Sequence, residues 1–220
     1  MSDVRWTFPA MTTAYSSGPT AAPLPPPVPV QITSNGFQLR TLRQADVTPR
    51  FVEWINAPAM RTGLNLSPQA IDDTTLRGYI NGFDGHRNHM IGIFDQGLLI
   101  GFYTLDVNAK HRVATVTAGI GETGCEHRRV YWATIDALID HFFIYRNIDK
   151  ITAHVLARNR AMLFNFIDNG RFFFEARLRD ECLDQDGQRH DVLIFAAFHK
   201  GERPAGLLYT PHLQRALSCP

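Results

Sequence analysis

Along residues 37–198 the spacing of hydrophobic positions changes repeatedly between every second residue and every third or fourth. Alternation over Phe37–Leu42 predicts a strand. The next residues, from Gln44 onward, predict a helix because their apolar positions share one face: Val47, Phe51, Trp54 and Ile55. A second helix is predicted to start at Ser67-Pro68 and to run towards Gly82, since proline is pre-set for a first helical turn.

Three strands are predicted in quick succession in the middle of the chain: His89–Phe94, Leu98–Val107 and Val113–Ile120. The residue types at Asp95-Gln96-Gly97 favour a hairpin turn between the first two strands, so an antiparallel meander is expected. The longest helix is predicted over Tyr131–Tyr145, where apolar residues recur at three- and four-residue intervals. Its broad apolar face must lie against the sheet.

The last third of the chain predicts a strand over Ile148–Leu156, a short helix over Ala161–Ile167, and strands over Arg171–Leu178 and Asp191–Phe198. Asn169-Gly170 is expected to end the short helix. The predicted order is therefore β-α-α-β-β-β-α-β-α-β-β. Because three consecutive strands sit together before the long helix, the sequence predicts an α/β protein with a mixed sheet, of the α+β kind, and not a strictly doubly wound one.

The two ends of the chain differ from this middle part. Residues 1–34 hold seven of the 13 prolines, and successive prolines fix an extended backbone. We expect a flexible N-terminal arm there; a docking peptide for a proline-binding module, or an arm fixed to the body by Trp6 and Phe8, are the alternatives. A domain over 35–200 and a tail over 201–220 follow. The apolar residues of the tail suggest packing on the body or on a second subunit, and hence a homodimer in the latter case.

Composition narrows the class of protein. The chain of 220 residues is 45% hydrophobic and 20% charged, which is typical of a soluble globular protein. Its 22 Lys and Arg residues nearly balance 21 Asp and Glu residues, so we expect no nucleic-acid partner and no membrane partner. The first thirty residues lack the basic start and apolar core of a secretion signal, and a cytoplasmic location is expected.

The cysteines and histidines give no sign of a metal site. Cys125, Cys182 and Cys219 are odd in number and widely spaced, so we expect reduced thiols. His86 and His89 lie three residues apart, but no second pair follows at a recognisable interval. No metal is therefore predicted.

Several ordered segments carry a family resemblance: Leu39–Asp46, Trp54–Pro58, Asn159–Gly170, Phe174–Asp180, and Gly187 with Asp191. Together with the predicted element order, they resemble the GNAT superfamily of N-acetyltransferases, and most closely its branch that acetylates ribosomal-protein N-termini (RimJ/RimL-like). The resemblance covers residues 37–198. It implies two central strands that splay apart, acetyl-CoA as the acyl donor, and an amine acceptor: a protein N-terminus, a lysine or a small molecule.

The loop before the long helix departs from the family's pattern Gln/Arg-x-x-Gly-x-Gly/Ala, which binds the CoA pyrophosphate. In one register the loop is Glu126–Tyr131, which matches none of the three defining positions. A shift of two residues gives Arg128–Ala133, which restores the first and last positions but places Tyr131 at the middle glycine. Glycine is expected there because its backbone approaches a phosphate without a side chain. We therefore interpret this loop as degenerate.

Three hypotheses follow from this departure. In the first, acetyl-CoA is retained because Arg128 and Arg129 bind phosphate oxygens through their guanidinium groups. In the second, the donor is an acyl carrier protein or carries a longer acyl chain, and the basic loop faces an acidic partner. In the third, the chain is a non-catalytic binding or scaffold protein with this fold. The first is the default, and its loop residues are His127, Arg128, Arg129, Val130 and Tyr131.

The resemblance also implies donor-binding residues outside the loop. Backbone groups of Ala118, Gly119 and Ile120 are expected to pair with the pantetheine arm, which needs small side chains on a closely approached strand. Asn159 matches an asparagine that caps the last helix of the family and contacts the same arm. A capping role alone also explains this residue.

The catalytic residues usual in the branch are replaced here. Thr115 stands where a glutamate base is frequent, and Phe166 stands where many members have a tyrosine acid. Glu122, just beyond the predicted strand, is the predicted general base, since partial burial would raise its pKa, and Tyr103 is the second catalytic candidate. Asp106 and His89 are the alternatives.

The acceptor is expected to bind near the first two helices and the loop at 57–66. Arg61 in that loop is a candidate for holding an acidic group of the acceptor. The acidic turn at 180–186 is the opposite candidate, for attracting a cationic amine, although such turns are usually only solvated. The acceptor's identity stays open at this point.

Overall fold

Two tight hairpins turn where the backbone adopts positive φ angles. In the computed structural model of the protein, Asn35 and Gly36 have φ angles of 49° and 87° and join β1 (Gln31–Ser34) to β2 (Phe37–Thr41). Gln96 and Gly97, with φ angles of 46° and 85°, join β3 (Asn88–Asp95) to β4 (Leu98–Asn108). Two-residue turns of this kind match the twist of the strands, so they fix the register of both hairpins.

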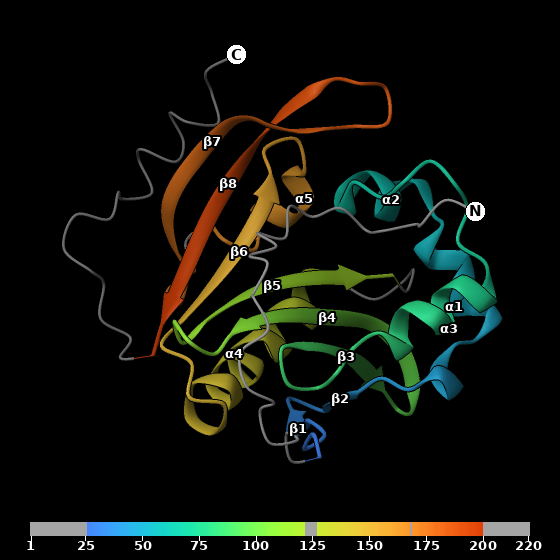
Figure 1. Cartoon of the computed structure of the whole chain (residues 1–220), viewed down its shortest axis with the longest axis vertical. Coiled ribbons are helices and arrows are strands. Elements are labelled where there is room, and N and C mark those ends of the chain that lie inside the picture. Colours follow the sequence, from blue (N-terminus) through green and yellow to red (C-terminus); the bar gives the residue numbers. More distant parts are fainter. Residues whose placement is uncertain (1–25, 122–126, 168, 200–220) are drawn as a thin grey trace, which may run out of the picture.

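The structure describes residues 26–121, 127–167 and 169–199. Their strands form one eight-stranded sheet in the order β1-β2-β3-β4-β5-β6-β8-β7 (Figure 1). The other strands are β5 (Val113–Ile120), β6 (Lys150–Leu156), β7 (Phe173–Leu183) and β8 (Arg189–Phe198). Among these described strands only β5 and β6 are parallel neighbours, and α4 (His127–Tyr145) makes the crossover that such a pair requires.

Helices cover both faces of the sheet (Figure 1). One face carries the 3-10 helix η1 (Gln44–Asp46) followed by α1 (Pro49–Ile55), α2 (Pro58–Leu64) and α3 (Asp73–Asn81). The other face carries α4 and the short α5 (Arg160–Leu163). Each face has its own buried cluster: Phe51, Trp54, Leu76 and Phe102 lie in the first, and Ile135, Phe142, Ile151 and Phe195 in the second. The sheet therefore separates two cores.

The helices that precede β3 differ from the predicted ones. The helix predicted from Ser67-Pro68 begins only at Asp73, because the Asp72 carboxylate accepts a hydrogen bond from the Thr75 amide and caps it there. α2 forms within the segment predicted as a loop, and it starts at Pro58. The short last helix ends at Leu163, four residues before its predicted end.

β1 falls within the stretch for which an N-terminal arm was expected. It is an edge strand that pairs only with β2, which is the place in a sheet where a proline-rich approach is tolerated. The limits of the arm, the domain and the tail stay predictions. Among the described residues, no helix has the length and apolar character needed to cross a membrane.

Candidate active site

The sheet opens between its two parallel strands. β5 and β6 pair from Val113 and Lys150 to Val116 and Ala153, and their pairing ends there. Beyond that point β5 stays with β4 as far as Ile120, whereas β6 stays with β8. The strands therefore diverge, and the exposed edge of β5 offers backbone groups to a ligand.

A cavity of about 710 Å³ fills this opening. Residues 116–118 of β5 and 153–156 of β6 form its middle. On the α4 face its wall is made by Tyr131, Ile135, Met162 and Phe166. On the other face it is lined by the loop at 63–71, by Thr75, and by residues 181–185 at the end of β7. Because both faces contribute, the cavity passes through the sheet at the point where the strands part.

The wall on the α4 face is aromatic. The Tyr131 ring meets the Phe166 ring edge-on at 5.8 Å between centroids, and Phe166 stacks on Phe195 at 4.6 Å. Burial raises the pKa of Tyr131 well above its ordinary value, so this phenol stays neutral. Its hydroxyl is buried and has no hydrogen-bond partner among the described residues. Such a group is costly unless a ligand or water completes it.

The wall on the opposite face is held by polar contacts from distant parts of the chain. The Arg61 guanidinium donates to the carbonyl oxygens of Ser67 and Gln69, the latter at 3.0 Å. The Asn56 amide donates to the Ile71 carbonyl at 2.7 Å and accepts from the Ile71 amide at 2.8 Å. These contacts fix the loop at 66–71, so Arg61 is engaged by the protein's own backbone.

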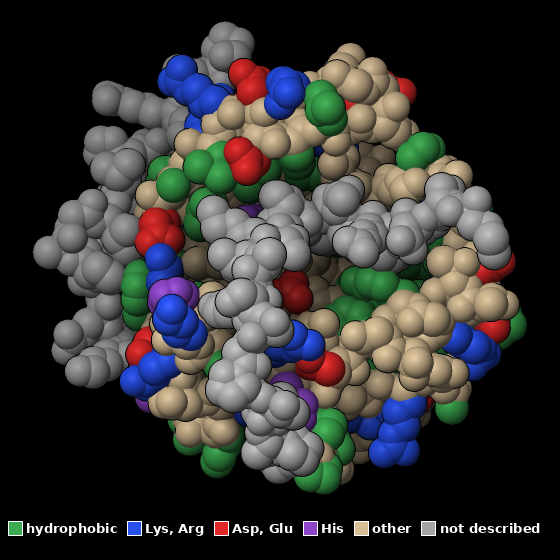
Figure 2. Space-filling model, in the orientation of Figure 1, with side chains coloured by type: hydrophobic (Ala, Val, Ile, Leu, Met, Phe, Trp, Pro, Cys, Tyr) green, Lys and Arg blue, Asp and Glu red, His purple; other side chains and the backbone are tan. Residues whose placement is uncertain are grey.

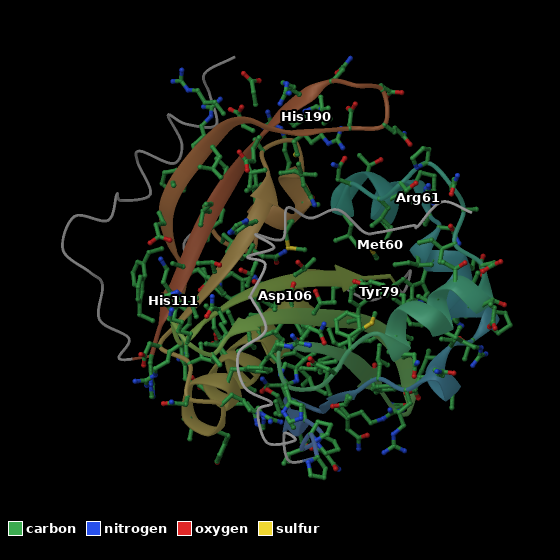
Figure 3. All side chains as sticks on the ribbon, in the orientation of Figure 1. Met60, Arg61, Tyr79, Asp106, His111 and His190 are labelled. Atoms are coloured by element: carbon green, nitrogen blue, oxygen red, sulfur yellow. The ribbon has the colours of Figure 1, made fainter. Side chains whose placement is uncertain are left out.

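A second polar group joins this wall to the β7–β8 hairpin. The Asp184 carboxylate accepts from Arg158 at 2.8 Å and from His190 at 2.7 Å, while Arg158 also donates to the Asn65 carbonyl oxygen at 3.0 Å. Figure 3 shows His190 on the β7–β8 hairpin and Arg61 on α2, the two elements that these contacts join to the wall. The His190 hydrogen bond and the amides of Gln188 and Asp186 lower the pKa of Asp184 to about 2. The acidic turn is therefore partly neutralised within the protein.

Asn159 connects the two walls. Its side-chain oxygen accepts from the Met162 amide at 3.1 Å and caps α5, as expected. Its amide nitrogen donates to the Gly63 carbonyl of α2 at 3.1 Å. A Cβ at Gly63 would lie 3.1 Å from that nitrogen, so glycine permits this close approach.

The other predicted donor-binding residues lie close to the opening. Ala118 lines the cavity, and Gly119 and Ile120 continue β5 beyond it. A Cβ at Gly119 would lie 2.8 Å from the Phe102 ring, so this glycine is also needed for packing. His127, Arg128 and Arg129 lie in the first turn of α4. Val130 is buried against the core.

The predicted catalytic residues lie outside the cavity lining or outside the described residues. Tyr103 is fully buried, and its hydroxyl shares a 2.8 Å hydrogen bond with Thr134. His89 is also buried, and its ring meets Phe142 edge-on. Glu122 falls outside the described residues. Their roles stay predictions.

Asp106 lies on the sheet face that carries α1–α3. It pairs across the strands with Thr115, the position where the branch often has a glutamate, and Figure 3 shows Asp106 and Tyr79 on this same face. Burial raises the pKa of Asp106, and burial together with the Asp106 charge raises the pKa of Tyr79 to about 12. Figure 2 shows Lys and Arg side chains scattered over this side of the molecule.

Two side chains of the cavity wall were missed by the sequence analysis. His154 of β6 and Cys182 of β7 both line the cavity. The signal for His154 was the alternation in β6, which places Thr152 and His154 opposite the buried Ala153 and Val155. The signal for Cys182 was absent, because β7 extends five residues beyond its predicted end. No group of three potential metal ligands gathers within the described ranges.

Of the comparisons with known proteins, the one with solved structures defines the fold. No protein-family model and no curated protein matches the sequence. The RimL ribosomal L7/L12 α-N-protein acetyltransferase superposes with a TM-score of 0.67 at 19% identity, covering 80% of this chain and 98% of that one. Spermidine N-acetyltransferase from Vibrio cholerae, in complex with CoA and spermine, superposes with a TM-score of 0.64 at 23% identity. The match covers 76% of this chain and 97% of that one. Microcin C7 self-immunity acetyltransferase, in complex with acetyl-CoA and AMP, superposes with a TM-score of 0.64 at 12% identity. The match covers 74% of this chain and 93% of that one.

The protein therefore has the GNAT acetyltransferase fold, with its mixed α+β sheet, and the predicted fold class is confirmed. The likeness extends over nearly the whole length of the compared structures. At these identities it defines the fold alone.

Proposed function

We propose that the protein is an N-acyltransferase that moves an acetyl group from acetyl-CoA to an amine. The observation that carries this proposal is the cavity that passes through the sheet where β5 and β6 part. An acyl donor and an acceptor can approach one point from opposite faces of such a cavity. Reaction between two bound partners gains most from this kind of fixed geometry.

The α4 face suits the donor. The free edge of β5 at 117–120 provides backbone donors and acceptors for the amides of a pantetheine arm. The aromatic wall suits its apolar parts, and the unpartnered Tyr131 hydroxyl can donate to a ligand oxygen. α4 is 19 residues long, and its N-terminal amides favour phosphate. Solved GNAT structures with CoA or acetyl-CoA support this choice of donor.

The opposite face suits the acceptor. Its wall is built from residues 63–71 and 181–185, which are held in place by the Arg61 and Asp184 contacts. Spermidine and the N-terminus of a ribosomal protein are the acceptors named for structures of this fold. Since both are amines, we assign an amine to this side and leave its size open.

Calorimetric titration with acetyl-CoA and with desulfo-CoA tests the donor. We expect saturable micromolar binding that weakens at least tenfold, or about 1.4 kcal/mol, in an Arg128→Ala/Arg129→Ala variant. The matched control is Arg43→Ala/Arg87→Ala, which removes the same charge from exposed positions outside the cavity lining and leaves the affinity unchanged. Release of free thiol in the presence of a panel of amines then tests transfer.

Failure to bind any CoA at millimolar concentration would contradict the proposal. Transfer from an acyl carrier protein, or capture of a ligand without transfer, would then explain the cavity. Binding of acetyl-CoA with no thiol release for any amine would leave a binding protein with the GNAT fold and would equally overturn the enzymatic function.

A further inference from the structure

His154 occupies the point where the sheet opens. It lies one residue beyond Ala153, the last residue of β6 that pairs with β5. Ala153 and Val155 face the α4 core, so the alternation of the strand turns His154 to the opposite face. The Thr152 hydroxyl, which meets the Thr115 hydroxyl at 3.1 Å, confirms that even-numbered residues here face away from α4. The imidazole lines the cavity and is exposed to it.

Apart from the Glu181 carboxylate, the other ionisable side chains of the cavity wall are less able to accept a proton. Asp184 is occupied by Arg158 and His190, and its pKa of about 2 makes it a weak base. Burial raises the pKa values of Tyr131 and Cys182, so both keep their protons at neutral pH. Arg189 is a cation and donates to the Asp180 carbonyl at 2.8 Å. Among the described residues the His154 imidazole has no hydrogen-bond partner, so its ring nitrogens are available to a ligand in the cavity.

The surroundings of His154 favour the neutral imidazole. Desolvation lowers the pKa of His154, and the carboxylates of Glu181 and Glu175 on β7 partly oppose this effect. Glu175 is itself paired with Lys150 at 2.5 Å. The neighbouring strand β8 places Ile194 beside His154, Thr117 of β5 also lines the cavity, and the loop at 63–71 carries no charged side chain. The remaining charged or titratable groups of this region are Asp184, Arg189, Cys182, Arg158, His190, Asp106 and Tyr79.

We propose that His154 is the group that takes the proton from the acceptor amine during acyl transfer; this inference rests on the proposed function. The amine nitrogen attacks the thioester carbonyl carbon and forms the C–N bond, and an imidazole nitrogen of His154 takes the proton that the nitrogen loses. The C–S bond then breaks, and the thiolate takes up one proton, which the imidazolium returns directly or through a water molecule in the open cleft. One amide and one thiol result, with no net change in protons. Glu181 stabilises the imidazolium that forms between these steps.

The first test is the pH dependence of kcat/KM for the amine in the wild type, His154→Gln and His154→Asn. Loss of a positioned base costs about 10²-fold or more, and the acid limb that reports the base disappears. In the wild type this limb lies below pH 6.5, the ordinary histidine value, because the pKa of His154 is lowered. Glu181→Gln removes an opposing charge and moves the limb to still lower pH. His111→Gln, in the exposed turn labelled in Figure 3, is the matched control and leaves rate and limb unchanged.

The second test does not require activity. The ring proton of His154, identified by its loss in the His154→Gln spectrum, titrates by NMR below pH 6.5 in the protein without ligands. Acetyl-CoA affinity measured by calorimetry stays unchanged in His154→Gln, because the residue serves the acceptor side. Unchanged affinity distinguishes the loss of a base from misfolding and from the loss of acetyl-CoA binding.

Each outcome decides one of the two proposals. Turnover that keeps its rate and its acid limb in both His154 variants overturns the role of His154 and leaves the transferase intact. Absence of thiol release by the wild type with every amine overturns the proposed function, and the role of His154 falls with it.

Discussion

The two walls of the cavity are built in different ways. The α4 wall consists of aromatic and aliphatic side chains that belong to the larger core, such as Tyr131, Ile135 and Phe166. The opposite wall consists largely of loop residues outside helices and strands, at 65–71 and 184–185. Its shape depends on side chains that bind backbone groups far away in the sequence, such as Arg61 and Asn56.

This difference assigns different tasks to the two walls. The α4 wall cannot change without disturbing the core, because buried side chains are packed at the density of a crystal. The opposite wall can change its loops while the strands stay in place, as loops usually do in functional sites. A shared donor on the first wall and a variable acceptor on the second would follow from this arrangement. Substitutions should therefore affect stability on the α4 wall and local order or specificity on the other.

The largest effect is expected from Phe166→Ala on the α4 wall. Phe166 is 5% exposed and contacts the rings of Tyr131, Phe172 and Phe195. Its removal leaves a cavity and should lower the free energy of unfolding by about 3–5 kcal/mol, measured by urea denaturation. Phe164→Ala is the matched control: that side chain is 60% exposed and its removal should change the free energy by less than about 0.5 kcal/mol. A loss at Phe166 as small as that expected at Phe164 would show that the wall is not part of the core.

The next effect is expected from Asp184→Asn on the opposite wall. The variant keeps the shape of the side chain but loses the charge that Arg158 and His190 bind. The folded-state pKa of Asp184 is lowered to about 2, so its contribution to stability is fully present above about pH 4, the ordinary carboxyl range, and is lost as the pH falls towards 2. Melting temperatures of wild type and variant should therefore differ most above pH 4 and converge in acid.

Asp186→Asn in the same turn controls for the charge change. The Asp186 side chain is exposed, and only its backbone amide binds Asp184. The melting temperature of the Asp186→Asn variant should equal that of the wild type at every pH. A gap between wild type and Asp184→Asn that stays equally large between pH 7 and pH 2.5 would show that the ion pair does not hold this wall.

A smaller effect is expected from Asn159→Ala, where the two walls meet. The variant loses the cap of α5 and the hydrogen bond to the Gly63 carbonyl, and should lose about 1–2 kcal/mol of unfolding free energy in urea. Asn159→Asp keeps the capping oxygen but cannot donate to Gly63. It should therefore recover part of the loss. No difference between the two variants would mean that the link to α2 contributes nothing.

Much of the fold could be predicted because it depends on local patterns. The alternation in β3–β5 and the three- and four-residue spacing in α4 gave the right elements, and the structural comparisons confirm the predicted fold. The errors lie where two local signals compete. Pro68 predicts an earlier helix start, but the Asp72 side chain caps the helix later, and only the folded loop shows which of the two applies.

The candidate site could be predicted only in part. Ala118, Tyr131 and Asn159 stand next to recognisable elements, and all three line the cavity. His154 was missed because a histidine within a strand has no motif of its own. Its position in the cavity depends on where β6 diverges from β5, which no local pattern shows. The contacts of Arg61 with the loop at 67–69 and of Asp184 with Arg158 join residues that no spacing rule connects.

The smallest effect, and the one of opposite sign, is expected from Tyr131→Phe. In the wild type the Tyr131 hydroxyl is buried without a hydrogen-bond partner in the described part of the chain. Removing it should leave the free energy of unfolding unchanged or raise it by about 1 kcal/mol, because a buried donor is no longer unsatisfied. In the presence of saturating acetyl-CoA the wild type should instead have the higher free energy of unfolding, since only the Tyr131 hydroxyl can donate a hydrogen bond to the ligand.

Tyr103→Phe is the matched control for the same atom change in the same core. The Tyr103 hydroxyl shares a 2.8 Å hydrogen bond with Thr134, so its loss should cost about 1 kcal/mol with or without the ligand. Urea denaturation of both variants, with and without acetyl-CoA, separates the two cases. If Tyr131→Phe loses as much as Tyr103→Phe in the free protein, the Tyr131 hydroxyl is already satisfied and the α4 wall offers no such donor to a ligand. If Tyr131→Phe is more stable than the wild type by the same amount with and without acetyl-CoA, the Tyr131 hydroxyl does not donate a hydrogen bond to this ligand.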